Sequence, residues 1–193
     1  MTEKILSGRI AIITGANQGL GREISKSYVT AGANVMLCAR NYDLLEKVEL
    51  ELNPLLGKNQ KICIKKCDVT NENEVNALVH DTLDKLGGCQ ILVNNAGIYG
   101  PKGAIEDQDW DEWKKAIEIN VFGSVLMCRT LVPHFKKQNY GKIIQLSGGG
   151  ATKPLPNLSV YATSKAAIVR FSDTLAEEVR RFRIDVNAIA PGA

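Results

Sequence analysis

Short apolar runs rich in β-branched residues alternate along this chain with longer amphipathic stretches. The short runs predict strands at residues 9–14, 33–39, 61–67, 90–94, 142–146 and 184–189. The amphipathic stretches predict helices at about residues 20–30, 43–52, 72–85, 109–136 and 159–181, and Pro133 is expected to bend or end the fourth helix. Strand–helix alternation at this spacing is typical of βαβ units and of a parallel sheet.

The composition of individual strands predicts their places in the sheet. Residues 9–14 and 90–94 are almost entirely apolar, as expected of strands covered on both faces, whereas lysines alternate with apolar residues in 61–67, which suits an edge. In the doubly wound order 3-2-1-4-5-6 the first and fourth strands are central and the third is an edge. We therefore predict an α/β fold, a Rossmann-like doubly wound parallel sheet with helices on both faces. The sixth strand, which carries Asp185 and Asn187, forms the other edge.

Length and charge argue against several other classes of protein. The chain of 193 residues, 45% hydrophobic and 23% charged, is sized for a single domain over residues 1–193 with a core of its own. The net charge of +3 comes from scattered Lys and Arg, so we expect no nucleic-acid partner. The sequence shows neither a membrane-length apolar run nor a secretory signal, so we expect no membrane partner and a cytoplasmic location.

Cysteine and histidine usage indicates neither disulfides nor a metal site. The five cysteines form no CxxC pair, and most stand in apolar stretches, where a reduced thiol behaves as a small hydrophobe. The two histidines, His80 and His134, lie far apart in the sequence. We therefore expect buried, reduced cysteines and no bound metal.

The first predicted strand runs directly into a glycine-rich turn, TGANQGLG from Thr14 to Gly21, which a helix follows. Glycines at such a turn let the backbone approach a pyrophosphate, whose charge the helix N-terminus favours. The alternative is a tight turn that uses glycine for steric reasons alone. In the context of this strand and helix we predict a dinucleotide site formed by Gly15, Asn17, Gln18, Gly19, Leu20 and Gly21.

Two further strand ends carry residues suited to the rest of a dinucleotide. An acidic residue at the end of the second strand would bind a ribose 2′-hydroxyl, but here Ala39 is followed by Arg40, which suits a 2′-phosphate, and Arg22 opens the nearby helix. This favours NADP over NAD, the alternative being that Arg40 is a solvated loop charge. Asp68 and Val69 follow the third strand, where Asp68 is either a loop or cap residue or the acceptor of an adenine amino group.

Tyr161 and Lys165 stand four residues apart in the last predicted helix and therefore share one of its faces. A free tyrosine, with a pKa of about 10, is a poor acid–base catalyst at neutral pH. A nearby ammonium, together with the positive nicotinamide of an oxidised cofactor, would stabilise the phenolate and lower that pKa. The spacing by itself is also that of an ordinary Tyr–Lys pair on an amphipathic helix.

Taken in order, these motifs resemble the short-chain dehydrogenase/reductase family, in the branch with TGxxxGxG. The resemblance covers the whole chain and rests on Thr14 to Gly21, Asp68, Asn94, Asn95, Ala96, Gly97, Asn120, Ser147, Tyr161, Lys165, Pro191 and Gly192. It implies that Tyr161 exchanges the proton at the substrate oxygen, that Lys165 also binds the nicotinamide ribose, and that Asn120 holds a proton-relaying water. It further implies that Asn95, Ala96 and Gly97 flank the cofactor. Pro191 and Gly192 would lie beside the nicotinamide.

One position departs from the family pattern. In that family the serine that binds the substrate oxygen stands thirteen residues before the tyrosine, where this chain has Gly148; Ser147 stands fourteen before it. Either a shift in the glycine-rich loop brings the Ser147 hydroxyl to the usual place, which we favour, or one hydrogen bond to the developing oxyanion is absent. Loss of such a donor costs on the order of 10²–10³ in rate.

The sequence therefore predicts an NADP-dependent oxidoreductase that transfers a hydride between nicotinamide and a small carbonyl or alcohol substrate. Its catalytic set is Asn120, Ser147, Tyr161 and Lys165. Two other readings stay open. One is a non-catalytic NADP-binding regulatory or partner protein, and the other is a cofactor-using isomerase or dehydratase on the same fold.

Two expectations concern what surrounds this chain. By resemblance we expect a homodimer or homotetramer built on the outward faces of helices 109–136 and 159–181, including Ala166, Ala167 and Phe171. The chain ends on a Pro-Gly turn signal, so we also expect a substrate lid and a seventh strand to follow Ala193.

Overall fold

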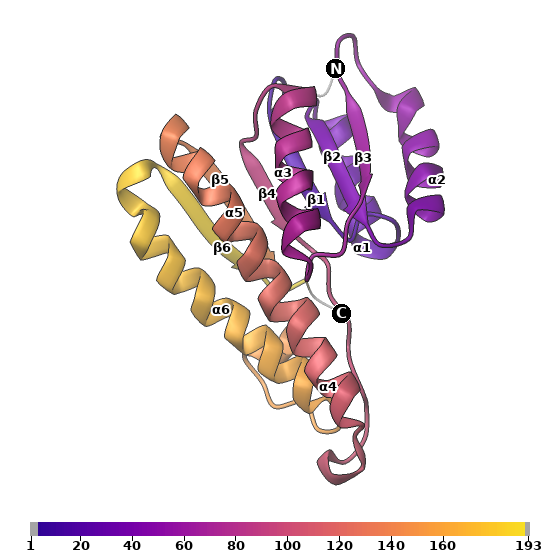
Figure 1. Ribbon diagram of the computed structural model, residues 1–193, viewed down its shortest axis with the longest axis vertical. Helices are drawn as coiled ribbons and strands as arrows, with labels where there is room; N and C mark the ends of the chain where they lie inside the picture. Colours follow the sequence, from indigo (N-terminus) through magenta and orange to yellow (C-terminus); the bar gives the residue numbers. More distant parts are fainter. Residues whose placement is uncertain (1–3, 192–193) are drawn as a thin grey trace.

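The computed structural model describes residues 4–191 and contains one sheet of six parallel strands (Figure 1). The strands are β1 (Ile10–Thr14), β2 (Asn34–Ala39), β3 (Ile62–Lys66), β4 (Ile91–Asn94), β5 (Gly141–Leu146) and β6 (Ile184–Ile189). They lie in the order β3-β2-β1-β4-β5-β6, and every neighbouring pair is parallel. The predicted doubly wound order is confirmed.

Helices cover both faces of the sheet, as predicted. Helices α1 (Gly19–Thr30) and α2 (Tyr42–Leu52) pack on one face, and α3 (Glu72–Leu86), α5 (Gly123–Gln138) and α6 (Ser159–Val179) pack on the other. Successive residues of β1 serve the two layers, since Ile12 belongs to the α3–α5–α6 core and Ile13 to the α1–α2 core. Both side chains are fully buried, and each stabilises the fold by roughly 1.5–3 kcal/mol.

Local capping residues fix where the helices begin and end. The side chains of Asn41, Asn71 and Asp109 each accept backbone N–H bonds at the starts of α2, α3 and α4 (Trp110–Ile117). Gly87, at φ 84°, and Asn139, at φ 52°, end α3 and α5 in the left-handed conformation. These boundaries lie within a few residues of the predicted ones because the caps are local sequence signals.

The predicted helix at 109–136 is interrupted. Between α4 and α5 the chain makes a π-helical turn over Glu118–Phe122, and the helix then continues through Pro133 to Gln138. The helix does not end at Pro133. This residue lies on the exposed side of the helix, where water can solvate the backbone carbonyl that loses its N–H partner. Together with the start of α6, α4 extends beyond the carboxyl ends of the strands (Figure 1).

By length and composition alone, the combined helix Trp110–Gln138 is long and apolar enough to cross a membrane. The sequence analysis had expected no segment of this kind. Half of its apolar window is buried inside the protein. Residues of its second half, including Met127, Leu131 and Phe135, belong to the main core. The same composition therefore suits a core helix of this sheet.

The two edges of the sheet carry the predicted polar residues. On β6, Asp185 and Asn187 are exposed, and Asp185 pairs with Lys142 of β5. On β3 most side chains are only half-buried, including Cys63, whereas the other four cysteines are buried and all five are free thiols.

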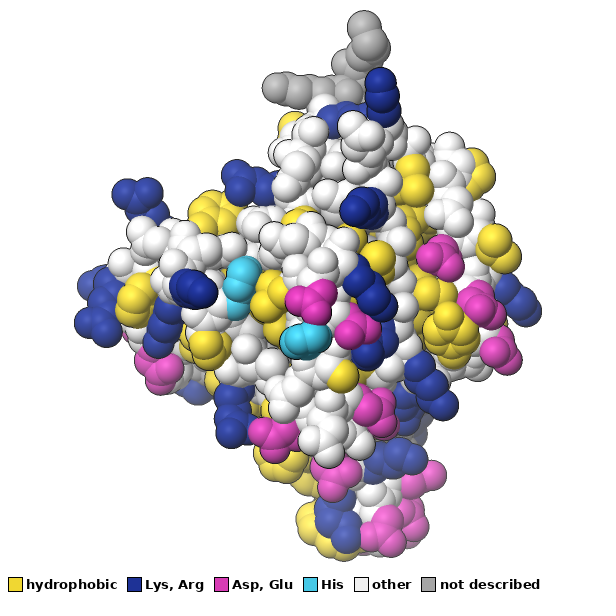
Figure 2. All heavy atoms as spheres, turned by 45° about the horizontal axis from the view of Figure 1, so that its top comes forward, with side chains coloured by type: hydrophobic (Ala, Val, Ile, Leu, Met, Phe, Trp, Pro, Cys, Tyr) yellow, Lys and Arg dark blue, Asp and Glu magenta, His cyan; other side chains and the backbone are white. Residues whose placement is uncertain are grey.

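Among residues 4–191 no cluster of His, Cys, Asp and Glu could hold a metal ion. Lys and Arg alternate with Asp and Glu over the face shown in Figure 2.

Candidate active site

A cleft of about 800 Å³ opens at the carboxyl ends of the central strands. It lies between the turn after β1 and the loop after β4, the crevice in which open α/β sheets bind ligands. The predicted cofactor residues that line it are Gly15, Asn17, Gln18, Gly19, Leu20, Gly21, Arg40, Asp68, Val69, Asn95, Ala96 and Gly97. It is also lined by Ile98 and Tyr99, which belong to the segment 98–108 that the sequence predicts to border the substrate pocket. The sequence analysis did not predict the remaining lining residues, namely Ala39, Asn41, Leu44, Cys67 and Ile119. These residues carry no motif of their own, so only the fold brings them to the cleft.

The glycine turn presents backbone rather than side chains to the cleft. Gly15 and Gly19 have φ values of 64° and 52°, which favour glycine. A Cβ on Gly21 would collide with the Gly15 carbonyl oxygen and would lie 2.5 Å from the Asn95 amide nitrogen. Helix α1 begins with no side-chain cap and no acidic residue in its first turn, so its free N–H groups suit an anion. The turn therefore fits the pyrophosphate of a dinucleotide.

Asn95 fastens the loop after β4 to this turn. Its side-chain amide donates to the carbonyl oxygens of Thr14 and Gly15, at 2.9 and 3.1 Å. In return, the Thr14 hydroxyl accepts the backbone N–H groups of Asn95 and Ala96, both at 3.0 Å. The two loops that line the cleft are thus held in one geometry.

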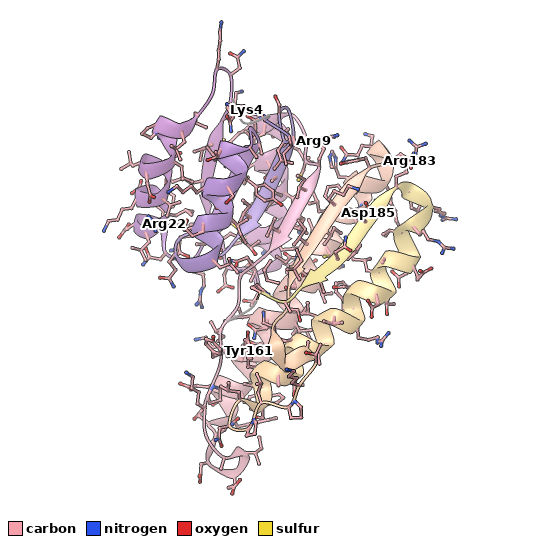
Figure 3. The ribbon with its side chains drawn as sticks, turned by 180° about the vertical axis from the view of Figure 1, so that it is seen from behind. Lys4, Arg9, Arg22, Tyr161, Arg183 and Asp185 are labelled. Carbon is pink, nitrogen blue, oxygen red and sulfur yellow. The ribbon has the colours of Figure 1, made fainter. Side chains whose placement is uncertain are left out.

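Tyr161 and Lys165 share a face of α6, as predicted, and Figure 3 shows Tyr161 just past the carboxyl ends of the strands. The Lys165 ammonium lies 5.6 Å from the centre of the Tyr161 ring. It donates a 2.7 Å hydrogen bond to the carbonyl oxygen of Leu146 at the end of β5. Lys165 is buried and Tyr161 is half-buried, so the pair stands in a partly dehydrated site.

Burial shifts the pKa values of both groups toward their neutral forms. The pKa of Tyr161 is raised, mainly by desolvation and further by the neighbouring Tyr99. Desolvation lowers the pKa of Lys165 to about 8. The sequence analysis expected the tyrosine pKa to be lowered, but in the protein itself burial raises the pKa of Tyr161. The other half of that expectation rested on the charge of the nicotinamide.

Asn120 lies in the π-helical turn, a distortion often found at functional sites. Its side-chain oxygen accepts the Ile98 N–H at 2.8 Å, and its amide donates to the Ile98 carbonyl at 2.8 Å and to the Ser164 hydroxyl at 2.9 Å. Both amide hydrogens are therefore engaged. A relay water at Asn120 would have to be held by an oxygen lone pair rather than by the amide hydrogens.

Residues 9–193 match the family model described as short chain dehydrogenase. The chain belongs to the short-chain dehydrogenase/reductase family. The 7alpha-hydroxysteroid dehydrogenase of Escherichia coli (strain K12) is 38% identical to it over 188 residues, 97% of this chain and 72% of that protein. A structure of NAD+-bound xylitol dehydrogenase matches with a TM-score of 0.93 and 29% identity, covering 97% of this chain and 71% of its own. A structure of a metagenomic short-chain oxidoreductase in complex with NADP matches with a TM-score of 0.89 and 30% identity. The match covers 97% of this chain and 84% of that one.

As a short-chain dehydrogenase/reductase, the protein is an NAD(P)-dependent enzyme that acts on CH–OH and C=O groups. Its small-molecule substrate is an alcohol or a carbonyl compound, and the reaction is a hydride transfer. The predicted catalytic residues Asn120, Ser147, Tyr161 and Lys165 are not among the residues that line the cleft, but Tyr161 stacks on Tyr99, which does line it.

In this short-chain dehydrogenase/reductase the Ser147 hydroxyl is directed toward α6. Ser147 is buried, and its hydroxyl donates to the backbone oxygen of Lys165 at 3.3 Å. Gly148 is the residue beside the tyrosine, because a Cβ built on it would lie 2.5 Å from the Tyr161 hydroxyl oxygen. In this structure a residue without a side chain faces the Tyr161 hydroxyl, and the role of Ser147 at the substrate oxygen stays a prediction.

The arginine expected to support NADP binding is engaged elsewhere. The Arg22 guanidinium donates to both carboxylate oxygens of Glu51, at 2.8 and 2.7 Å, and lies in the α1–α2 layer away from Tyr161 (Figure 3). Arg40 is exposed and lines both the main cleft and an adjoining hollow. Asp68 lines the cleft, and one of its carboxylate oxygens accepts the N–H and hydroxyl of Thr70, as expected of a loop residue. Its contact with an adenine amino group stays a prediction.

Pro191 and Gly192 were also predicted to bind the cofactor. Pro191 is exposed and lies outside the cleft lining formed by residues 4–191. Gly192 lies outside the described residues. Their position beside the nicotinamide stays a prediction.

Proposed function

We propose that this enzyme uses NADP and that Tyr161 is its general acid and base. The observation that supports this most directly is the position of Tyr161, which lies near the buried Lys165 and stacks on Tyr99, a residue that lines the cleft. When bound, the cofactor supplies or accepts the hydride. The fit of the turn to a pyrophosphate supports dinucleotide binding along the floor formed by residues 15–21.

The protein groups divide the acid–base work. In carbonyl reduction, the Tyr161 hydroxyl donates its proton to the substrate oxygen, and in alcohol oxidation the phenolate takes that proton back. Lys165, whose pKa of about 8 leaves it mostly protonated at neutral pH, stabilises the phenolate electrostatically and, on the family resemblance, also binds the ribose. Asn120 holds the Ile98 backbone that borders the cleft. Ser147 supports α6 through the Lys165 carbonyl.

The preference for NADP rests on the end of β2. No acidic residue stands there to bind a ribose 2′-hydroxyl, since the strand ends at Ala39 and Arg40 follows. Arg40 and Lys66 are both exposed and line the hollow next to the cleft, together with Asn41, Tyr42 and Asp43. Two cations at this point favour a 2′-phosphate.

A screen of NADPH oxidation over carbonyl compounds tests the proposal. It includes 7-oxo steroids and ketoses, because a hydroxysteroid dehydrogenase and a xylitol dehydrogenase are among the relatives. We expect turnover with NADPH to exceed that with NADH, and Tyr161→Phe to abolish turnover while NADPH still binds. Unimpaired turnover in Tyr161→Phe, or a preference for NADH, contradicts the corresponding half of the proposal.

The non-catalytic alternative draws on one observation, the glycine beside the tyrosine hydroxyl. It predicts tight NADPH binding without turnover of any carbonyl compound. Measuring cofactor binding by fluorescence alongside the screen separates the two, because only the enzyme consumes NADPH.

We also propose that the protein self-associates through the outward faces of α4, α5 and α6. Trp110 and Phe122 support this, since they are 63% and 59% exposed. Ala166 is exposed and Ala167 half-buried, but Phe171 was wrongly assigned to this surface, because it packs against the main core. Sedimentation of a clean monomer at micromolar concentration would contradict the proposal.

A further inference from the structure

Tyr99, in the loop that follows β4, stacks on Tyr161. The two ring centres are 4.7 Å apart and the ring planes differ by 33°. This is the tilted, offset arrangement that aromatic pairs prefer. The Lys102 ammonium lies 5.0 Å from the centre of the Tyr99 ring. Tyr99 nevertheless remains 55% exposed and lines the cleft.

The loop that carries Tyr99 is anchored on both sides of that residue. Before it, the backbone N–H and carbonyl of Ile98 are both bound by the Asn120 side chain. After it, Gly100 has a φ of 72°, and a Cβ there would lie 2.6 Å from Val160 and 2.8 Å from Ala116. The loop backbone is therefore packed directly against α4 and the start of α6. Tyr99 is held in place by the protein before any substrate binds.

Gly148 limits the position of Tyr161 at the hydroxyl end. A Cβ on Gly148 would lie 2.5 Å from the hydroxyl oxygen and 3.3 Å from the ring carbon that bears it. The hydroxyl thus stands closer to this backbone than a side chain at position 148 would permit. Two contacts therefore define where the Tyr161 hydroxyl lies. The Tyr99 ring stacks on the Tyr161 ring, and the backbone of Gly148 lies beside the hydroxyl.

We propose that Tyr99 is a positioning residue, whose ring holds the Tyr161 hydroxyl against the backbone of Gly148. In this chain, placement of the proton donor would then depend on an aromatic stack and not on a neighbouring serine hydroxyl. The inference rests on the proposed role of Tyr161. It assigns a function to a residue that no motif in the sequence marks.

The same stack controls the access of water to Tyr161. Burial is the main cause of the raised pKa of this phenol, and charge repulsion by the neighbouring Tyr99 hydroxyl, which both Tyr99→Phe and Tyr99→Ala remove, adds to the shift. Lys165 faces the ring from α6, and Lys102 lies on Tyr99. The turn after β5 contributes Gly148, which has no side chain to titrate. Removal of the Tyr99 ring should therefore hydrate the phenol and lower its pKa.

A titration that needs no substrate tests this first. Phenol ionisation is followed by absorbance in Tyr99→Phe and Tyr99→Ala, each paired with its Tyr161→Phe double variant, so that the difference reports Tyr161 alone. We expect the Tyr161 pKa to stay raised in Tyr99→Phe and to fall toward the ordinary value of about 10 in Tyr99→Ala. Equal values in the two variants would overturn the proposal.

Kinetics provide the second test, with NADPH and the ketone that the carbonyl screen returns. We expect Tyr99→Ala to lower kcat by about 10- to 100-fold with little change in KM for NADPH, and Tyr99→Phe to restore most of kcat, because the ring and not its hydroxyl does the positioning. Tyr140→Ala is the matched control. Its ring also carries nearby cations, Arg9 at 4.8 Å and Lys142 at 5.3 Å, but lies at the amino end of β5.

Each outcome bears on one claim. An unchanged kcat in Tyr99→Ala, or an equal loss in Tyr140→Ala, overturns the positioning role. If no ketone is reduced, the proposed function fails, while the phenol titration still decides whether Tyr99 positions and shields Tyr161.

Discussion

The Lys165 ammonium of α6 donates a hydrogen bond to the Leu146 carbonyl oxygen 2.7 Å away. This bond ties the helix that carries Tyr161 to the end of β5. The strand end also needs a partner there, because its carbonyl is the last of the strand. Lys165 therefore serves the fold and the site through one atom.

Lys165 should make stability depend on pH. Its pKa in the folded protein is about 8, whereas an unfolded lysine titrates at about 10.4. Between those values the unfolded chain binds a proton that the folded chain does not, so the free energy of unfolding rises with pH across that window. Below it the folded state bears a buried charge, at a cost of about 3 kcal/mol. Urea unfolding at about pH 7 and about pH 10 measures this.

The matched variant for that measurement is Lys165→Met, which keeps an unbranched chain of similar length. In this variant we expect the free energy of unfolding not to rise with pH across that window. An identical pH dependence in wild type and variant would show that Lys165 titrates normally.

Gly148 and Gly149 form a natural pair for testing the contact at the tyrosine hydroxyl. Neither has a left-handed φ, and a Cβ on Gly149 meets nothing within 4 Å. We expect Gly148→Ala to lower kcat by about 10- to 100-fold, because its methyl group displaces the Tyr161 hydroxyl, and Gly149→Ala to behave like wild type. Steady-state kinetics on the ketone found by screening decide this. Wild-type kcat in Gly148→Ala would mean that the hydroxyl is free to move.

Asn120 should be a stability residue as well as a site residue. Asn120→Ala leaves the N–H and carbonyl of Ile98 without their partners, at roughly 1–3 kcal/mol for each group that stays buried. We expect a lower urea midpoint and faster hydrogen exchange at the Ile98 amide. Asn73→Ala, on the exposed side of α3, serves as the control. Equal destabilisation in both variants would argue against the role of Asn120.

Arg40 and Arg22 should differ in their effect on cofactor preference. A charge-assisted bond to a 2′-phosphate contributes about 1.5–3 kcal/mol, so Arg40→Ala should reduce the NADPH-to-NADH ratio of kcat/KM by about 10- to 100-fold. Arg22→Ala should leave that ratio unchanged, because the guanidinium is bound to Glu51. A ratio that falls in Arg22→Ala instead would show that this ion pair opens for the cofactor.

Much of the fold was predictable because its signals are local. The apolar β1 and β4 and the lysine-bearing β3 indicated their places in the sheet, and the amphipathic stretches indicated the helices. The π-helical turn at Glu118–Phe122 was not predictable in this way. Its residues continue the apolar pattern of a helix, and the distortion appears only where Asn120 meets Ile98 and Ser164.

The sequence by itself determined the order of the strands, the glycine turn and the Tyr161–Lys165 pair, because periodicity and spacing along one helix encode them directly. It also showed that glycine stands thirteen residues before the tyrosine. Only the tertiary structure decided what that means. Ser147 turns to the Lys165 carbonyl, Gly148 meets the Tyr161 hydroxyl, and Tyr99 stacks on its ring. These relationships join segments that are distant in sequence, so packing across the sheet's carboxyl edge, and no local pattern, places them.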